Sequence, residues 1–201
     1  SVIVLGEDVG LNGGVFRATE GLYDRFGEAR VIDTPLAESG IVGTSIGMAL
    51  AGLRPVCELQ FSGFSYLAIG QIEGHAARVR NRSQGQYSVP MVVRMPYGGG
   101  IRALEHHSES KEATYAHFPG LKVVIPSTPT NARALLRASI DDPATVICME
   151  PKHSYRAWRE EVPADCEPIA IGEAQVLQAG NDITLVAWGA MMRQAQKAAA
   201  E

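Results

Sequence analysis

The sequence predicts an α/β fold built on a parallel β-sheet. Along residues 1–150, short runs rich in β-branched residues alternate with longer segments of helical periodicity, and most of the runs are apolar throughout. Continuous apolar strands are typical of a sheet that is covered on both faces. The alternation of strands with helices further predicts parallel strands joined by helical crossovers.

The expected elements follow one another in this order. The strands are Val2–Leu5, Val56–Phe61, Met91–Met95, Lys122–Ile125 and Thr145–Met149. The helices are Thr19–Phe26, Ser39–Leu53, Phe64–Arg80 and Asn131–Ile140. Gly27 can end the first helix, and Thr130 or Asn131 can begin the last one.

The pattern changes after residue 155. Residues 156–169 are rich in proline and charge, which is typical of a linker. Two more strands, Ile171–Leu177 and Ile183–Trp188, and a helix, Ala190–Glu201, are expected after it. We therefore expect a first domain at 1–155, a linker at 156–169 and the start of a truncated second α/β domain at 170–201.

Composition excludes several classes of partner. The 201 residues carry 18 Lys and Arg against 22 Asp and Glu, which leaves a formal net charge of −4. Without a basic footprint, nucleic acid and anionic membrane surfaces are not expected partners. Apolar runs fall short of the roughly 20 residues that a membrane span requires. Cys57, Cys148 and Cys166 are too far apart for a Cys-x-x-Cys pair, which favours a reducing intracellular compartment. The expected location is the cytoplasm, or the mitochondrial matrix in a eukaryote.

One motif suggests a different enzyme class. The run from Gly43 to Gly47 matches the Gly-x-Ser-x-Gly nucleophile elbow, and Asp142 and His153 follow Ser45 in the order of an α/β-hydrolase. An elbow requires a strand that runs directly into the serine, whereas Ser45 lies within a predicted helix. A Ser45 hydrolase is therefore a remote alternative.

Two polar features are candidates for chemistry by residue type. His106 and His107 follow a glycine-rich run in a segment too polar for a core, and histidine exchanges protons near neutral pH. They lack the third ligand at helical spacing that a zinc site would show, so general acid–base catalysis and a merely solvated pair are the two interpretations. Glu38 opens a predicted helix, where a carboxylate commonly just compensates the helix dipole.

Longer strings of sequence carry a family resemblance. They include Gly6-Glu7-Asp8-Val9-Gly10, Arg30-Val31-Ile32-Asp33-Thr34-Pro35-Leu36-Ala37-Glu38, Pro119-Gly120-Leu121-Lys122-Val123-Val124 and Glu150-Pro151-Lys152. In this order they resemble the β subunit of thiamine-dependent 2-oxo acid dehydrogenases over nearly the whole chain. The resemblance implies the parallel-sheet pyrimidine-binding domain of the thiamine diphosphate-binding, transketolase-like fold, followed by the start of that family's C-terminal domain.

The resemblance also implies roles for individual residues. Glu38 is implied to hydrogen-bond a ring nitrogen of the cofactor's aminopyrimidine, so that the imino tautomer can remove the proton from the thiazolium carbon. Phe64 is implied to stack on the pyrimidine, with Leu36 and Gln60 as its neighbours. His107 is implied to lie beside the substrate carboxylate and the lipoyl arm, where it would donate a proton during acyl transfer. His106 is a weaker candidate because its spacing demands no such contact.

The same resemblance implies that the active site is divided between chains. Thiamine diphosphate is shared with an α subunit, which holds the diphosphate through Mg²⁺ in an α₂β₂ heterotetramer. The lipoyl domain of the dihydrolipoyl acyltransferase component accepts the acyl group. The family can also bind a K⁺ ion through backbone carbonyls, here those of Ser139, Ile140, Asp142 and Ala144. Backbone ligands leave no side-chain signature in the sequence.

The expected reaction is the oxidative decarboxylation of a branched-chain 2-oxo acid with reductive acylation of lipoyl-lysine. The run 96–101 and the pair Ser108-Glu109 are more similar to branched-chain or broad-specificity members than to pyruvate-specific ones. A pyruvate or acetoin dehydrogenase β subunit is the alternative, and a noncatalytic interaction module on the same fold is a remote one. Gly70 stands where many relatives have Asp, and Glu109 where many have Gln, but neither change removes Glu38 or His107.

Overall fold

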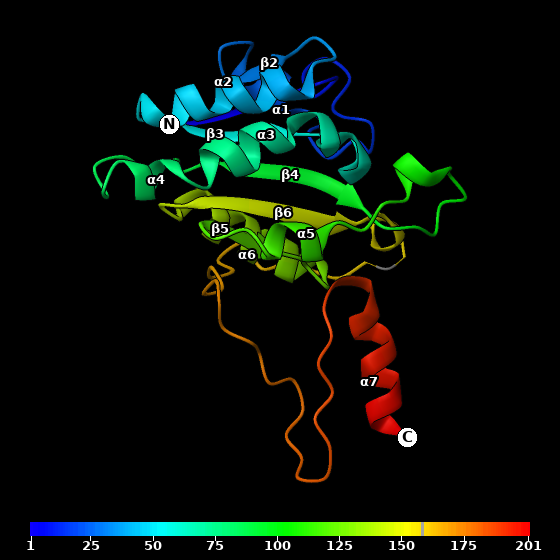
Figure 1. The fold of residues 1–201 in the computed structure, drawn as a ribbon. Helices are drawn as coiled ribbons and strands as arrows, with labels where there is room; N and C mark the ends of the chain where they lie inside the picture. The colour runs from blue at the N-terminus through cyan, green and yellow to red at the C-terminus, as the bar shows by residue number, and fades with distance from the viewer. Residues whose placement is uncertain (158) are drawn as a thin grey trace.

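The computed structural model describes residues 1–157 and 159–201. Within them, six strands form one sheet in the order β2-β1-β3-β4-β6-β5 (Figure 1). The strands are β1 (Val2–Gly6), β2 (Val31–Asp33), β3 (Arg54–Glu58), β4 (Val92–Tyr97), β5 (Leu121–Val124) and β6 (Thr145–Pro151). Every pairing in this sheet is parallel, which confirms the predicted α/β class.

The helices are mostly short. The α-helices are α1 (Leu22–Phe26), α2 (Glu38–Leu50), α3 (Ile69–Gln71), α4 (Val79–Arg82), α5 (Glu112–Ala116), α6 (Pro129–Asp141) and α7 (Met192–Ala200). The 3-10 turns are η1 (Ser62–Ala68), η3 (Glu105–His107), η4 (Lys152–Ser154) and η5 (Gly189–Met191), and η2 (Ile72–Ala76) is a π-helix. No helix within the described residues is both long and apolar enough to span a bilayer.

The two faces of the sheet carry separate hydrophobic cores. In β4, Val93 belongs to the larger core and Val92 to the smaller one, and in β6 Ile147 and Val146 divide in the same way. Because successive residues of a strand point to opposite faces, the two cores lie on opposite sides of the sheet. Residues of α2, η1, η2 and α5 complete the larger core, and those of α6 cover the smaller one. Burial on both faces explains why the strands are continuously apolar.

Several element boundaries differ from the prediction. The three-residue strand β2 was not expected, because it is too short to show a pattern. The predicted helix Phe64–Arg80 is divided into η1, α3, η2 and α4, and its glycines at 70 and 74 weaken a continuous helix. The α6 helix, expected from Asn131, begins at Pro129, and Thr128 caps it by accepting a hydrogen bond from the Asn131 N–H at 3.1 Å.

The strands expected at Ile171–Leu177 and Ile183–Trp188 are wrong. Both segments lie within the described residues and neither pairs with a strand, and Figure 1 shows this stretch in orange extending away from the sheet before α7. The side chains of Val176 and Ile183 are 83% and 78% exposed. A strand requires a neighbouring backbone to pair with its N–H and C=O groups, and neither segment is paired in this way. The proposed division at 155 and 170 stays a prediction, while α7 confirms the expected terminal helix.

The segment expected to be a linker lies along α6 at residues 160–166. The Thr130 N–H at the beginning of this helix donates to a carboxylate oxygen of Glu160 at 2.6 Å. Arg137, two turns further along α6, donates to the backbone carbonyl of Cys166 at 3.0 Å. The linker and the helix therefore run side by side in the same direction.

Candidate functional site

The predicted site residues lie at one edge of the sheet. Leu36 and Glu38 follow β2, Gln60 and Phe64 follow β3, and His107 lies in the segment after β4. The carboxyl ends of the parallel strands meet at this edge. The chain steps from β1 to β2 on one side and then to β3 on the other, so that β1 and β3 flank the topological switch point. Open α/β sheets bind ligands there.

Glu38 holds a buried carboxylate oxygen at this switch point. It is the first residue of α2 and is 4% exposed. Its Oε2 atom has no hydrogen-bond partner among the described residues. Because an unpaired buried polar atom is unfavourable, Glu38 is suited to accept a hydrogen bond from a group outside this chain. A donor on an aminopyrimidine ring fits this requirement.

Glu7 is a second buried carboxylate at the same edge, directly after β1. Burial raises the pKa of Glu7, and the nearby charges of Glu38 and Asp8 raise it further. Burial and these like charges therefore both disfavour the charged form of Glu7 relative to a free glutamate. Sequence reasoning did not select Glu7 as a site residue, although its position at the end of an apolar strand was a usable signal.

Phe61, Phe64 and His107 form an aromatic cluster at the same edge of the sheet, in the segments after β3 and β4. The centre of the Phe61 ring lies 5.3 Å from that of Phe64 and 4.6 Å from that of His107, and the last two are 5.2 Å apart. All three pairs meet edge to face, the arrangement that aromatic quadrupoles favour. The structure thus brings the predicted Phe64 and His107 together. Phe61, their shared neighbour, was missed because it was assigned to the end of a strand.

The other two predicted cofactor neighbours differ in their surroundings. The Gln60 side chain donates from Nε2 to Asp8 Oδ2 at 3.0 Å, which ties the end of β3 to the loop after β1. The Leu36 side chain is 78% exposed, so it is no part of the core and is open to contact by another molecule. His106, the weaker candidate, is exposed next to the half-buried His107.

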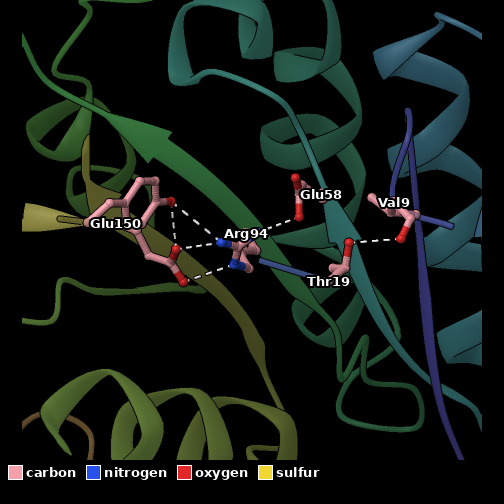
Figure 2. A network of polar contacts seen from close by, with 6 residues as sticks. Val9, Thr19, Glu58, Arg94 and Glu150 are labelled. Atoms are coloured by element: carbon pink, nitrogen blue, oxygen red, sulfur yellow. Dashed lines mark hydrogen bonds and ion pairs between the residues drawn. The ribbon is translucent and has the colours of Figure 1, made fainter. Parts of the chain in front are cut away.

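A buried ionic network joins the central strands near this edge (Figure 2). Arg94 of β4 pairs with Glu58 of β3 and binds both oxygens of Glu150 in β6, at 2.8 Å and 2.6 Å. Tyr155 donates its hydroxyl to Glu150 at 2.7 Å. Bidentate pairs of this kind are strong and geometrically specific. The network therefore ties the middle of β4 to the carboxyl-terminal ends of β3 and β6, the strands that precede the site loops.

A hydrogen bond drawn in Figure 2 fixes the loop after β1. The buried Thr19 hydroxyl donates to the carbonyl of Val9 at 2.8 Å. This contact holds the segment that carries Glu7 and Asp8, and Asp8 accepts the hydrogen bond from Gln60.

Two of the four carbonyls expected to bind K⁺ already have a cationic partner. The guanidinium of Arg54 donates to the carbonyls of Ile140 and Asp142 at 3.2 Å and 2.7 Å. The Asp142 carboxylate binds Lys122 at 2.6 Å. Within the described residues, no group of three or more His, Cys, Asp or Glu side chains is placed to hold a metal ion.

Ser45 does not have the geometry of a hydrolase nucleophile. It is fully buried in the middle of α2, and its hydroxyl donates to the carbonyl of Ile41 at 2.8 Å. A nucleophile elbow would instead expose this oxygen above the sheet. Asp142 is engaged by Lys122 and His153 is exposed, so the hydrolase alternative is contradicted.

The fold and the site together define a pyrimidine-binding α/β domain. The family model described as "Transketolase, pyrimidine binding domain" matches residues 1–157, and the chain belongs to this family. A solved structure titled "Split gene transketolase, inactive beta4 tetramer" shares the fold, with a TM-score of 0.76 and 20% identity over 99% of this chain and 60% of that one.

Curated relatives narrow the resemblance to β subunits. The chain is 56% identical over 198 residues to the pyruvate dehydrogenase E1 component subunit beta of Acholeplasma laidlawii, covering 98% of this chain and 61% of the relative. It is 52% identical over 192 residues to the same subunit of Mycoplasma genitalium, covering 96% and 59%. The 2-oxoisovalerate dehydrogenase subunit beta of Bacillus subtilis is 51% identical over 198 residues, covering 98% and 61%. The family resemblance expected from the sequence is confirmed, and the chain spans about 60% of the length of these relatives.

Proposed function

We propose that this chain supplies the pyrimidine-binding part of the β subunit of a thiamine-dependent 2-oxo acid dehydrogenase. The unpartnered, buried Oε2 of Glu38 at the switch point is the observation that carries the proposal. Relatives named as pyruvate and 2-oxoisovalerate dehydrogenase β subunits support the reaction class. The proposed reaction is oxidative decarboxylation of a 2-oxo acid followed by reductive acylation of lipoyl-lysine.

Thiamine diphosphate is the cofactor in this proposal. When bound, it supplies the carbon nucleophile and the electron sink for decarboxylation. Glu38 would share a proton with a ring nitrogen of the aminopyrimidine, since its carboxylate oxygen Oε2 has no hydrogen-bond partner among the described residues. Phe64 would pack against the ring, and Gln60 and Leu36 would border it.

His107 is proposed to act in the acyl-transfer half of the reaction. Its imidazole contacts Phe61 and Phe64 and is half-buried, so that part of the ring is left to reach a ligand. A protonated histidine beside a substrate carboxylate or a lipoyl sulfur can donate the proton that the departing thiolate needs.

The remaining parts of the site are assigned to other chains. We propose an α subunit that holds the diphosphate through Mg²⁺ in an α₂β₂ heterotetramer, and a lipoyl domain of the acyltransferase component as acyl acceptor. A K⁺ ion at 139–144 stays a prediction, and it would share the Ile140 and Asp142 carbonyls with Arg54.

Free cysteines at 57, 148 and 166 and bacterial relatives support a cytoplasmic location. The mitochondrial matrix stays a prediction for a eukaryote.

A branched-chain 2-oxo acid is the proposed substrate, and pyruvate is the second candidate. The 2-oxoisovalerate dehydrogenase relative supports the first, and the pyruvate dehydrogenase relatives support the second. Acetoin is a further alternative within the family.

The test is substrate-dependent reduction of an artificial electron acceptor by the full-length β subunit co-expressed with its α subunit. The assay contains thiamine diphosphate and Mg²⁺ and compares 2-oxoisovalerate, pyruvate and acetoin, with a Glu38→Gln enzyme as the matched inactive control. Preference for 2-oxoisovalerate supports the proposal, and preference for pyruvate or acetoin supports an alternative. Activity with none of the three contradicts the proposed function and supports the noncatalytic module.

A further inference from the structure

The segment that carries His107 packs against η1 at Gly63, where there is no space for a side chain. A Cβ atom at Gly63 would overlap the carbonyl oxygen of His106 and would lie 2.8 Å from its carbonyl carbon and 3.0 Å from Glu109 Cγ. The obstacle is backbone, which cannot rotate away as a side chain does. Any other residue at position 63 therefore requires the 105–109 segment to move.

Hydrogen bonds from the same region hold the other end of this segment. The buried Ser62 hydroxyl donates to the carbonyl of Glu109 at 2.8 Å. The N–H of Gly98, the residue after β4, donates to the same carbonyl at 2.8 Å. The contacts to residues 106 and 109 therefore flank His107 in the sequence, one before it and one after it.

His107 in turn contacts the two residues that flank Ser62 and Gly63 in the sequence. Phe61 precedes Ser62 and Phe64 follows Gly63, and both rings pack on the imidazole. One short turn, residues 61–64, therefore holds both the backbone around His107 and its ring. The position of the imidazole is set by contacts from this turn, and Gly63 determines how closely the two segments approach.

We propose that Gly63, assisted by Ser62, is a positioning residue for His107. By letting the His106 carbonyl lie directly on η1, it holds the imidazole against Phe61 and Phe64 at the distance that acyl transfer uses. Small displacements of a catalytic group are costly, since a 1 Å misplacement can lower a rate about 100-fold. The inference rests on the proposed function of His107.

The test uses the assembled α₂β₂ enzyme carrying Gly63→Ala. Acylation of the lipoyl domain is expected to fall at least about tenfold, whereas decarboxylation measured with an artificial electron acceptor stays within about twofold. Gly70→Ala is the matched control, because position 70 is exposed and has space for a Cβ, and it is expected to change neither rate. Hydrogen exchange of residues 101–110 is expected to rise in Gly63→Ala and to stay unchanged in Gly70→Ala.

Two further variants separate positioning from general damage. If Gly63 acts through His107, the double variant Gly63→Ala/His107→Ala acylates no more slowly than His107→Ala alone, whereas additive losses overturn the inference. Ser62→Ala removes one hydrogen bond without adding atoms, so it is expected to show a smaller loss confined to acylation, and it carries the test if Gly63→Ala fails to assemble. Equal losses in both assays, or no loss in either, overturn the inference. Wild-type enzyme inactive in both assays contradicts the proposed function instead.

Discussion

The ammonium group of Lys152 lies 5.4 Å from the centre of the Phe61 ring, where it is buried without a hydrogen-bond partner among the described residues. Lys152 is 4% exposed. Contact with an aromatic ring offsets part of the cost of taking an ammonium out of water, but not all of it. Burial accordingly lowers the pKa of Lys152 to about 8.

Replacing Lys152 by Met is expected to stabilise the folded chain at pH 7. The folded-state pKa of about 8 lies below the ordinary value of 10.5, so between these pH values the unfolded state binds more protons. The contribution of Lys152 to stability therefore rises with pH from about 8 to 10.5, and the advantage of Lys152→Met shrinks over that window.

Urea unfolding of both proteins at pH 7, 9 and 10 measures this difference. Lys197→Met, which removes an exposed lysine from α7, is the matched control and is expected to show no such trend. A constant difference between wild type and Lys152→Met across this range would contradict the assignment.

Removing the centre of the buried ionic network is expected to be severe. Arg94→Met leaves Glu58 and Glu150 buried without their shared cation, and loss of one partner of a buried pair costs about 3–5 kcal/mol. Arg17→Met is the control, because its ion pair with Glu20 is exposed and such pairs contribute about 0–1 kcal/mol. The free energies of unfolding of the two variants are compared in urea at pH 7, and similar losses would refute the structural role of the network.

Glu38→Gln separates function from folding. It is expected to abolish both the artificial-acceptor reaction and lipoyl acylation, with losses of about 100-fold or more, because proton transfer at the aminopyrimidine is lost. The melting temperature is not expected to fall, since glutamine keeps the size of the side chain and no hydrogen bond from the described residues to Oε2 is lost. An active enzyme with lowered stability would show that Glu38 serves the fold alone.

His107→Ala is expected to divide the two half-reactions. Acylation of the lipoyl domain falls more than decarboxylation with the artificial acceptor, because the proposed proton donation belongs to acyl transfer. His106→Ala, at the exposed neighbouring position, is the matched control and is expected to change neither rate. Equal loss in both assays would refute this division of roles.

Most strands of the sheet were predictable because strands buried on both faces appear in the sequence as continuous apolar runs. Val92 and Val93 face opposite cores, and both must be apolar whatever the details of packing. The β2 strand was not predictable, since its three residues become a strand only through pairing of Val4 with Val31 and its neighbours. The same rule explains the error at 171–177, where the segment forms no ladder of backbone hydrogen bonds with another strand.

The sequence by itself determined the parallel α/β class, the family and the candidacy of Glu38 and His107, because these depend on local pattern and on contiguous strings. Tertiary structure alone decided which residues meet. Phe61 and Gly63 contact the His107 segment because β3 and β4 are neighbours in the sheet, so that the loops after them share one edge. Strand order arises from long-range packing, which no local pattern encodes.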